Sequence, residues 1–392
     1  MLIKVDENGN WRSFRHRNFR ILYPANALSN IGTWAQRVAQ DWLVLELTDN
    51  NGFYLGLVTA IQFAPVLLFS LQGGAMADRI DKRKLLIWTN IVAALACYAL
   101  GILVVTEVIQ LWHVFVCAAV LGISSALDAP IRQSFTAEIV GHSDVANAVS
   151  LNSANFNAGR LVGPALSGFL IARFDTGPSF LINATTYLFV ILSLFFMRSS
   201  DFFIQKKEET LGTIREGLRY AKARPDLYVV MALVFFAATF GLNFQIFNAL
   251  MATKEFGKGP ASYGLLGTFI AVGSLSGALI SARLERFRDA KLVMKLGILF
   301  SIIVIVLSVM PTYTWYSLWL PVCGISALTM LISANSYVQV NSDPAVRGRV
   351  MGIYLLVFMG GTPVGSLLIG YLTEALGTRE TIALCGGFSL LM

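Results

Sequence analysis

Charged side chains are scarce in this 392-residue chain. Asp, Glu, Lys and Arg make up 14% of it and apolar residues make up 56%, whereas a typical soluble domain is about 25% charged. A water-soluble fold of this length needs more polar surface, so the composition argues against one. Cysteine and histidine are also rare: the four cysteines lie in apolar runs without Cys-x-x-Cys spacing, and the three histidines are isolated. This pattern favours small buried cysteine side chains over a disulfide or metal framework.

Sequence patterns typical of enzymes are missing too. The chain has no Gly-x-x-x-x-Gly-Lys-(Ser/Thr) phosphate loop and no His-Glu-x-x-His, and no Ser/His/Asp set lies at one plausible depth. We therefore expect no enzyme, no cofactor and no metal. The formal charge of +7 lies in loops between apolar runs, so we expect no nucleic-acid partner. The first twenty residues are not a secretory signal, because their apolar part is too short.

What is abundant is apolar sequence in runs of membrane-spanning length, which is about 20 residues for a helix. The pattern lacks the short alternating segments of a membrane β-barrel, so the fold class is an all-α polytopic membrane protein. The predicted spans are Phe19–Leu47, Phe53–Ala77, Lys84–Val105, Ile109–Ala129, Ala146–Ala172, Pro178–Met197, Leu227–Met251, Ser262–Ala282, Ala290–Met310, Trp315–Val340, Val346–Thr373 and Glu380–Met392. The last has only thirteen residues, so we expect a truncated twelfth helix.

A polar connection at 198–225 separates the spans into two sets of six. The predicted domains are an N-terminal six-helix bundle at 1–197, a cytoplasmic linker with an amphipathic helix at 198–225, and a C-terminal bundle at 226–392. Within the linker, Leu211, Ile214, Leu218 and Ala221 recur at helical spacing. A helix lying on the lipid surface is expected there, and binding of a partner is the alternative.

Positive charge sets the orientation. With the N-terminus in the cytoplasm, 24 of the 30 Lys and Arg residues fall on the cytoplasmic side and 4 on the external side, as the positive-inside rule requires. The two halves also resemble each other, since Gly163 and Gly168 match Gly365 and Gly370 at an offset of 202. A parallel repeat of this kind is one of the transporter layouts built around a cavity at mid-membrane depth.

The loop after the second span carries the most specific motif, "GGAMADRIDKRKLL". It resembles the major facilitator superfamily signature Gly-x-x-x-Asp-Arg-x-x-(Arg/Lys)-(Arg/Lys), matched here by Gly74, Asp78, Arg79, Lys82 and Arg83. The stretches "EGLRYAKARPDL" and "QRVAQDWLVLELT" are similar to the branch of bacterial exporters that includes enterobactin and macrolide exporters. The resemblance implies the major facilitator fold of two six-helix bundles and transport by alternating access.

The signature departs from the family at Asp81, where a Gly is usual. An acid at a membrane boundary is costly unless it is paired, and Asp78 could meet the positive N-terminal end of another helix. The resemblance implies the eleventh span for that partner. Asp128 is expected to pair with Lys82 or Arg79. We interpret these residues as a conformational latch, and the alternative is that the charged turn only sets topology and solubility.

Polar residues form a face inside the first span. Asn26, Asn30, Thr33, Arg37 and Asp41 follow i, i+3, i+4 spacing. A polar face in lipid is expensive, so these side chains should point into protein or a wet cavity. Two hypotheses stay open for Arg37 and Asp41: an internal pair that locks packing, or a pair in which Asp41 carries protons and Arg37 meets substrate.

Other spans contribute further candidates for the cavity. These are Asn157, Arg160, Asn243, Asn335 and Gln339. The amides are more often hydrogen-bond partners between helices than ligands, and for Arg160 a packing role is the favoured alternative.

The fifth span contains "GRLVGP". Its Gly159, Gly163 and Pro164 resemble the Gly-x-x-x-Gly-Pro motif of the superfamily's proton-driven exporters, although the Gly expected nine residues earlier is Ser150. Ordinary helix packing by small residues is the alternative.

The sequence therefore predicts a secondary active transporter that exports amphipathic small molecules of the drug or siderophore class, by proton antiport. The expected partners are a small-molecule substrate, protons and the lipid bilayer, and we expect a monomer in the inner membrane with a cytoplasmic N-terminus. A proton-coupled uptake permease and a lysolipid flippase are the alternatives within the transporter class. Outside it, a membrane enzyme or a receptor is disfavoured by the missing catalytic cluster.

Overall fold

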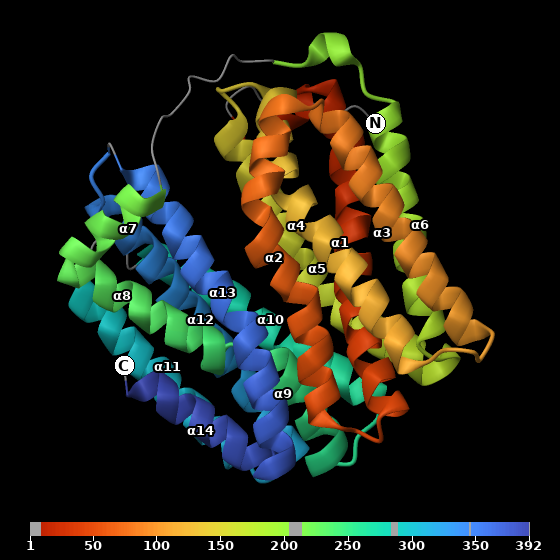
Figure 1. The fold of residues 1–392 in the computed structure, drawn as a ribbon, viewed down its shortest axis with the longest axis vertical. Coiled ribbons are helices and arrows are strands. Elements are labelled where there is room, and N and C mark those ends of the chain that lie inside the picture. Colours follow the sequence, from red (N-terminus) through yellow and green to blue (C-terminus); the bar gives the residue numbers. More distant parts are fainter. Residues whose placement is uncertain (1–8, 204–213, 284–288, 345, 392) are drawn as a thin grey trace. The chain divides into compact units, whose positions relative to one another are not determined.

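The structure is a computed structural model that describes residues 9–203, 214–283, 289–344 and 346–391. At 70, 71, 73–79, 214, 215, 217, 282 and 283 it describes the backbone alone. The long helices are α1 (Arg17–Leu47), α2 (Gly52–Arg79), α3 (Lys82–Val105), α4 (Leu111–Val140), α5 (Val145–Phe174), α6 (Gly177–Phe195), α10 (Pro260–Arg283), α11 (Ala290–Ser308), α12 (Tyr313–Asn341) and α13 (Arg347–Ala375) (Figure 1). Shorter ones are α7 (Ile214–Ala223), α8 (Pro225–Phe236), α9 (Phe244–Leu250) and α14 (Thr378–Leu390). The all-α prediction is confirmed.

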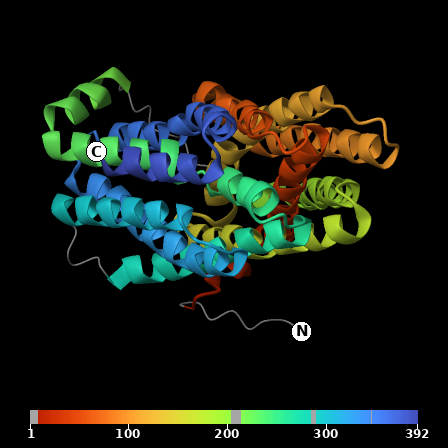
Figure 2. The same ribbon diagram turned by 90° about the horizontal axis from the view of Figure 1, so that it is seen from below.

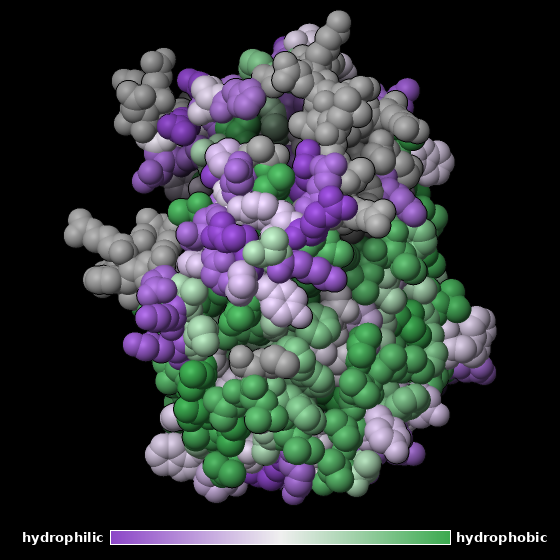
Figure 3. All heavy atoms as spheres, turned by 60° about the vertical axis from the view of Figure 1, so that its left-hand side comes forward, coloured by the Kyte–Doolittle hydropathy of each residue, from purple (hydrophilic) through white to green (hydrophobic). Residues whose placement is uncertain are grey.

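Nine stretches of the described chain are long and apolar enough to cross a membrane. Helices α1 and α5 are not among them, because they carry the polar residues that the sequence places at mid-depth. Large apolar side chains remain exposed along the helices, among them Leu95, Phe169 and Leu279. On the face drawn in Figure 3, apolar side chains cover a broad area while hydrophilic ones gather toward its upper end. This is the surface expected for helices solvated by lipid.

Helix contacts divide the chain into two compact units. The first comprises Met1–Gln40 and Pro65–Glu208, and the second comprises Asp41–Ala64 and Glu209–Met392. Helices α1 and α2 therefore each contribute one part to each unit. The boundaries predicted at 197 and 226 remain a prediction.

Each unit repeats the same pairings of helices. In the first unit α3 packs on α6 and α4, and in the second α11 packs on α14 and α12 (Figures 1 and 2). Buried apolar clusters fill both units, one around Phe19, Leu86 and Phe135 and another around Leu227 and Val350. The internal repeat predicted from glycine spacing thus appears as a repeated packing.

Two predicted spans differ from the observed helices. The fourth was expected to end at Ala129, but α4 continues to Val140, because the polar residues beyond Pro130 form contacts along it. The seventh was expected to be one helix, but it is α8 and α9 with π-helical segments at Ala237–Gly241 and Met251–Glu255. Wide π turns are common at functional sites.

The linker helix α7 packs against α13 and α8. Ala221 is buried in the second unit's core, and the exposed Glu216 accepts a hydrogen bond from Arg349 at 2.7 Å. Directly after α7, Arg224 donates to both carboxylate oxygens of Asp226, at 2.9 and 2.8 Å. These hydrogen bonds raise the pKa of Arg224. Helix α7 lies within the predicted linker and packs against α13. Its predicted position on the lipid surface stays a prediction. Leu211 lies outside the described residues.

Candidate functional site

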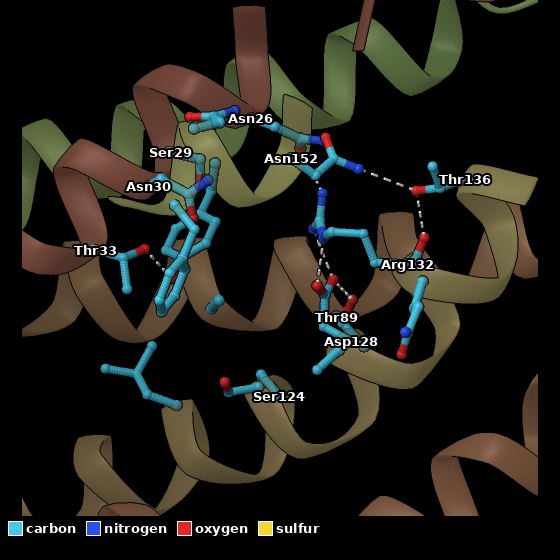
Figure 4. Close-up of a pocket in the computed structure, with 18 of the residues that line it drawn as sticks. Asn26, Ser29, Asn30, Thr33, Thr89, Ser124, Asp128, Arg132, Thr136 and Asn152 are labelled. Atoms are coloured by element: carbon cyan, nitrogen blue, oxygen red, sulfur yellow. Dashed lines mark hydrogen bonds and ion pairs between the residues drawn. The ribbon is translucent and has the colours of Figure 1, made fainter. Parts of the chain in front are cut away.

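The first unit contains a polar cavity of about 390 Å³. This is within the range of small-molecule sites, about 300–1,000 Å³. Most of its lining is hydroxyl, amide or charged: Asn26, Ser29, Asn30, Thr33, Arg37, Thr89, Ser124, Ser125, Asp128, Arg132, Gln133, Thr136, Asn152, Asn155 and Tyr187, with Ala93, Leu121, Ala129, Val149 and Phe156 completing it. Figure 4 shows Asn26, Asn30 and Thr33 along one helix, with Asp128 and Arg132 beyond the cavity. The predicted polar face of α1 from Asn26 to Arg37 therefore lines a cavity.

Asp128 and Arg132 form an ion pair on the wall of this cavity. Arg132 Nε and Nη2 donate to the two carboxylate oxygens at 2.7 and 2.9 Å, and Arg132 Nη1 donates to Asn26 Oδ1 at 2.5 Å. Thr89 and Asn90 also donate to Asp128, each at 3.0 Å. Arg132 was not predicted from the sequence, although its i, i+4 spacing from Asp128 on one helix was the available signal.

The expected pairing of Asp128 with Lys82 is wrong. Lys82 Nζ donates to Glu138 Oε1 at 2.6 Å instead, because α4 runs eleven residues further than predicted and brings Glu138 to its end. Arg83 donates to the Phe195 carbonyl at 3.0 Å. Both basic residues therefore join helices within the first unit. At Gly74, Asp78 and Arg79 only the backbone is described, and the latch remains a prediction.

Trp34 gathers two arginines beside the cavity. The guanidinium carbon of Arg37 lies 4.8 Å from the centroid of the indole and that of Arg160 lies 5.4 Å from it, both within cation–π range. Phe156 meets the same indole edge-on, with centroids 5.6 Å apart. Trp34 was not singled out from the sequence, because an aromatic residue in an apolar span carries no signal of its neighbours.

The glycines of the helix-five motif make this arrangement possible. A Cβ built at Gly159 would lie 2.9 Å from the Asn30 carbonyl carbon, and one at Gly163 would lie 2.5 Å from Trp34 Cβ. Any side chain there would push α5 away from α1. Helix α5 continues through Pro164 to Phe174. Gly159 and Gly163 therefore pack closely on α1, and Gly163 sets the position of Trp34. The exporter interpretation of the motif stays a prediction.

Asp41 lies in the second unit and is 2% exposed. Gln245 Nε2 donates to its Oδ2 at 2.5 Å, and the hydroxyl of Tyr263 donates to the same oxygen at 2.7 Å. Trp42 stacks on Tyr263 with centroids 6.3 Å apart. Because Gln245 and Tyr263 are more than 200 residues away in sequence, their meeting with Asp41 was not predictable from spacing.

The remaining predicted cavity residues, Arg160 included, are not among those that line this cavity. Asn157 donates to the Ser153 carbonyl at 2.9 Å in its own helix. Asn243 is buried and donates to the Thr239 carbonyl in the π segment at 2.8 Å. In α12, Asn335 is half-buried and Gln339 is exposed. This bond of Asn243 stabilises the irregular backbone of its own segment and is not the hydrogen bond between helices that was the alternative for the amides.

Asp144, at the start of α5, is a second buried acid that sequence reasoning missed. Its side chain is 3% exposed and lies 3.3, 2.8 and 2.8 Å from ring or guanidinium nitrogens of Arg12, Arg15 and His16. It fixes the segment preceding α1. Among the described residues, no group of three or more His, Cys, Asp or Glu side chains is placed to hold a metal ion.

Comparison with known proteins extends these observations to a family. Residues 8–392 match the model of a family described as "Transmembrane secretion effector". The staphyloferrin A transporter of Staphylococcus aureus is 23% identical over 94% of this chain and 92% of its own length. The enterobactin exporter EntS of Shigella boydii is 24% identical over 96% and 90%. The multidrug efflux pump Tap of Mycolicibacterium fortuitum is 25% identical over 88% and 86%.

A solved structure shows the same fold. A bacterial homologue of the human lysosomal transporter Spinster, in an inward-facing and unoccupied conformation, superposes with a TM-score of 0.78 at 15% identity, covering 96% of this chain and 95% of its own. The predicted all-helical membrane fold of the major facilitator type is confirmed. The family match and the related transporters confirm the expectation of a transporter in place of an enzyme.

Proposed function

Because this chain belongs to the transmembrane secretion effector family of major facilitator transporters, we propose that it exports amphipathic small molecules of the siderophore or drug class by proton antiport. The observation that carries the proposal is the polar cavity of about 390 Å³ inside helices of a membrane protein. Polar groups in a lipid-embedded bundle are expensive and mark substrate or ion pathways. Outward transport is favoured because relatives along most of the chain are named as exporters or efflux pumps.

Asp41 is the proposed proton carrier. Its described partners Gln245 and Tyr263 are neutral groups that can accept as well as donate hydrogen bonds. The same pocket of side chains can therefore hold the carboxylate or the neutral acid without a rearrangement of the helices. A buried acid with such partners is suited to gain and lose a proton during each transport cycle.

The orientation follows from the loop charges. We place the protein in the inner membrane as a monomer with a cytoplasmic N-terminus, on the positive-inside count of 24 to 4. In this orientation the proposed latch residues Gly74, Asp78, Arg79, Lys82 and Arg83 lie at the cytoplasmic face.

Everted membrane vesicles test the function. The vesicles carry an imposed inside-acid gradient and are offered a panel of native siderophores and dye substrates. Export predicts accumulation that collapses when a protonophore is added. Gradient-dependent extrusion from the vesicles would instead show an uptake permease. Movement of a fluorescent lysolipid between leaflets, with no accumulation of the panel, would show a flippase.

The Asp41→Asn variant tests the coupling. We expect it to lose gradient-driven accumulation and to keep exchange of labelled for unlabelled substrate, since exchange needs no net proton movement. The control is Asp49→Asn, because Asp49 is exposed and its positive φ of 50° suits asparagine. Normal proton-driven accumulation by Asp41→Asn would contradict the assignment of the carrier.

A further inference from the structure

We propose that the first-unit cavity selects organic anions with an aromatic part, and that Arg37, Arg160 and Trp34 make the selection. This inference rests on the proposed transport function, because it takes the cavity to be a substrate site. It adds the sign of the substrate's charge, which the names of the relatives leave open.

The first step is the charge of the cavity wall. Its charged lining residues are Arg37, Asp128 and Arg132, so the wall carries more positive than negative charge. Asp128 is engaged by both a bidentate arginine and two neutral donors. The negative charge of Asp128 is therefore balanced by Arg132 and by neutral donors in the cavity wall. Asp128 is poorly placed to attract a cationic ligand.

The second step is the arrangement around Trp34. The guanidinium carbons of Arg37 and Arg160 lie 4.8 and 5.4 Å from the centroid of the Trp34 indole. Arg37 lines the cavity, and this shared indole places Arg160 near it. Two like charges held near one ring repel each other, and an anion placed between them would relieve that repulsion. A guanidinium presents several donors in one plane and suits carboxylate, sulfonate or phenolate oxygens.

The third step is the apolar and aromatic surface beside these charges. Phe156 is 48% exposed and lines the cavity, as does Tyr187. Asn30 and Thr33, which lie along one helix in Figure 4, also line the cavity and offer hydrogen-bond donors. A ligand with an aromatic ring and an anionic group would satisfy both kinds of surface, whereas an aromatic cation would meet arginine charge on entry.

The position of Trp34 is set by the backbone, which makes it a positioning residue for both arginines. Gly163 lets α5 approach to the Cβ of Trp34, and Arg160 comes from the turn before Gly163 on the same helix. Arg37 comes from the turn after Trp34 on α1. The two arginines therefore reach the same indole from two helices held at a fixed separation.

Equilibrium binding of two dyes tests the proposal. Fluorescein and rhodamine 123 share a xanthene ring system and carry opposite charge at pH 8. Fluorescence anisotropy is measured with the purified chain in lipid nanodiscs, and empty nanodiscs correct for partition into lipid. We expect fluorescein to bind at least about tenfold more tightly than rhodamine 123, the value of one charge-assisted contact.

Substitutions identify the residues responsible. Arg37→Gln and Arg160→Gln should each weaken fluorescein binding roughly tenfold and leave rhodamine 123 binding equal or stronger. Arg37→Lys should keep part of the preference, and Trp34→Leu should reduce it without a change of charge. The control is Arg173→Gln, in the exposed last turn of the same α5, which should bind both dyes as the unsubstituted chain does.

Several results would overturn the proposal. These are equal or tighter binding of rhodamine 123 to the unsubstituted chain, binding of neither dye, or unchanged fluorescein binding in monodisperse Arg37→Gln and Arg160→Gln variants. The preference of the unsubstituted chain is decisive even if a variant aggregates. Because no gradient is applied, this test can fail while proton-driven export succeeds, and the reverse outcome is equally visible.

Discussion

The same glycine contact occurs in both halves of the chain, but it supports different chemistry. In the first unit, Gly159 and Gly163 of α5 pack on α1 at Asn30 and Trp34; in the second, Gly361 and Gly365 of α13, each 202 residues later, pack on Thr239 of the π segment. The steric requirement is shared, since two helices must approach closely in each unit. The charges are not shared, because Arg37 and Arg160 occur only beside the first contact.

The surroundings of the second contact are aromatic. Phe240 lies 6.1 Å from Phe236 and 5.3 Å from Phe388 between ring centroids. Thr239 donates its hydroxyl to the Phe235 carbonyl at 2.6 Å. This comparison indicates that the repeat preserves backbone packing, while the side chains around it have become a charged cavity wall in one unit and a neutral core in the other.

The largest expected effect comes from filling the shared contact. Gly163→Leu and Gly365→Leu should each destabilise the protein by about 3 kcal/mol, because the new side chain meets backbone or Cβ atoms that cannot move away. All four cysteines are buried, so a thiol-reactive dye reports thermal unfolding. Gly352→Leu is the matched control, since a Cβ there meets nothing within 4 Å. If either leucine variant were as stable as Gly352→Leu, the two glycine contacts would not share the same steric requirement.

The next effect tests the charged wall of the first-unit cavity. Asp128→Asn should cost about 2 kcal/mol, because Arg132 keeps its charge in a partly buried site and loses its carboxylate partner. The same dye assay measures it, with Asp175→Asn as the control at an exposed acid of the first unit. Stability equal to that of the control would show that the ion pair contributes nothing to the wall of the cavity.

The smallest effect belongs to a hydrogen bond between neutral side chains in the second unit. Tyr316 is fully buried, and its hydroxyl donates to Asn248 Oδ1 at 3.0 Å. Tyr316→Phe leaves that buried amide oxygen without this donor and should cost about 1 kcal/mol. Binding of fluorescein should be unchanged in this variant. A change in dye binding would show that the neutral core of the second unit also acts on the ligand site.

Much of the fold could be predicted because it depends on properties of contiguous residues. Most span boundaries agree with the helices within a few residues, since apolar runs and loop charges mark them directly. The predicted end of the fourth span was wrong because Arg132, taken without its partner Asp128, has the charge of a loop residue. The breaks in the seventh span were missed because a π turn depends on packing and on a hydrogen bond such as that of Asn243 to Thr239.

By itself the sequence determined the membrane class, the two-fold repeat and the polar face of α1, because hydropathy, charge and helical periodicity are local properties. Only the tertiary structure decided which polar groups meet: Arg132 with Asp128 and Asn26, Trp34 with two arginines, and Asp41 with Gln245 and Tyr263. These contacts join different helices or distant turns, and their formation depends on how closely the backbones approach. Glycines such as Gly163 set that approach, and a sequence shows a glycine without showing what packs against it.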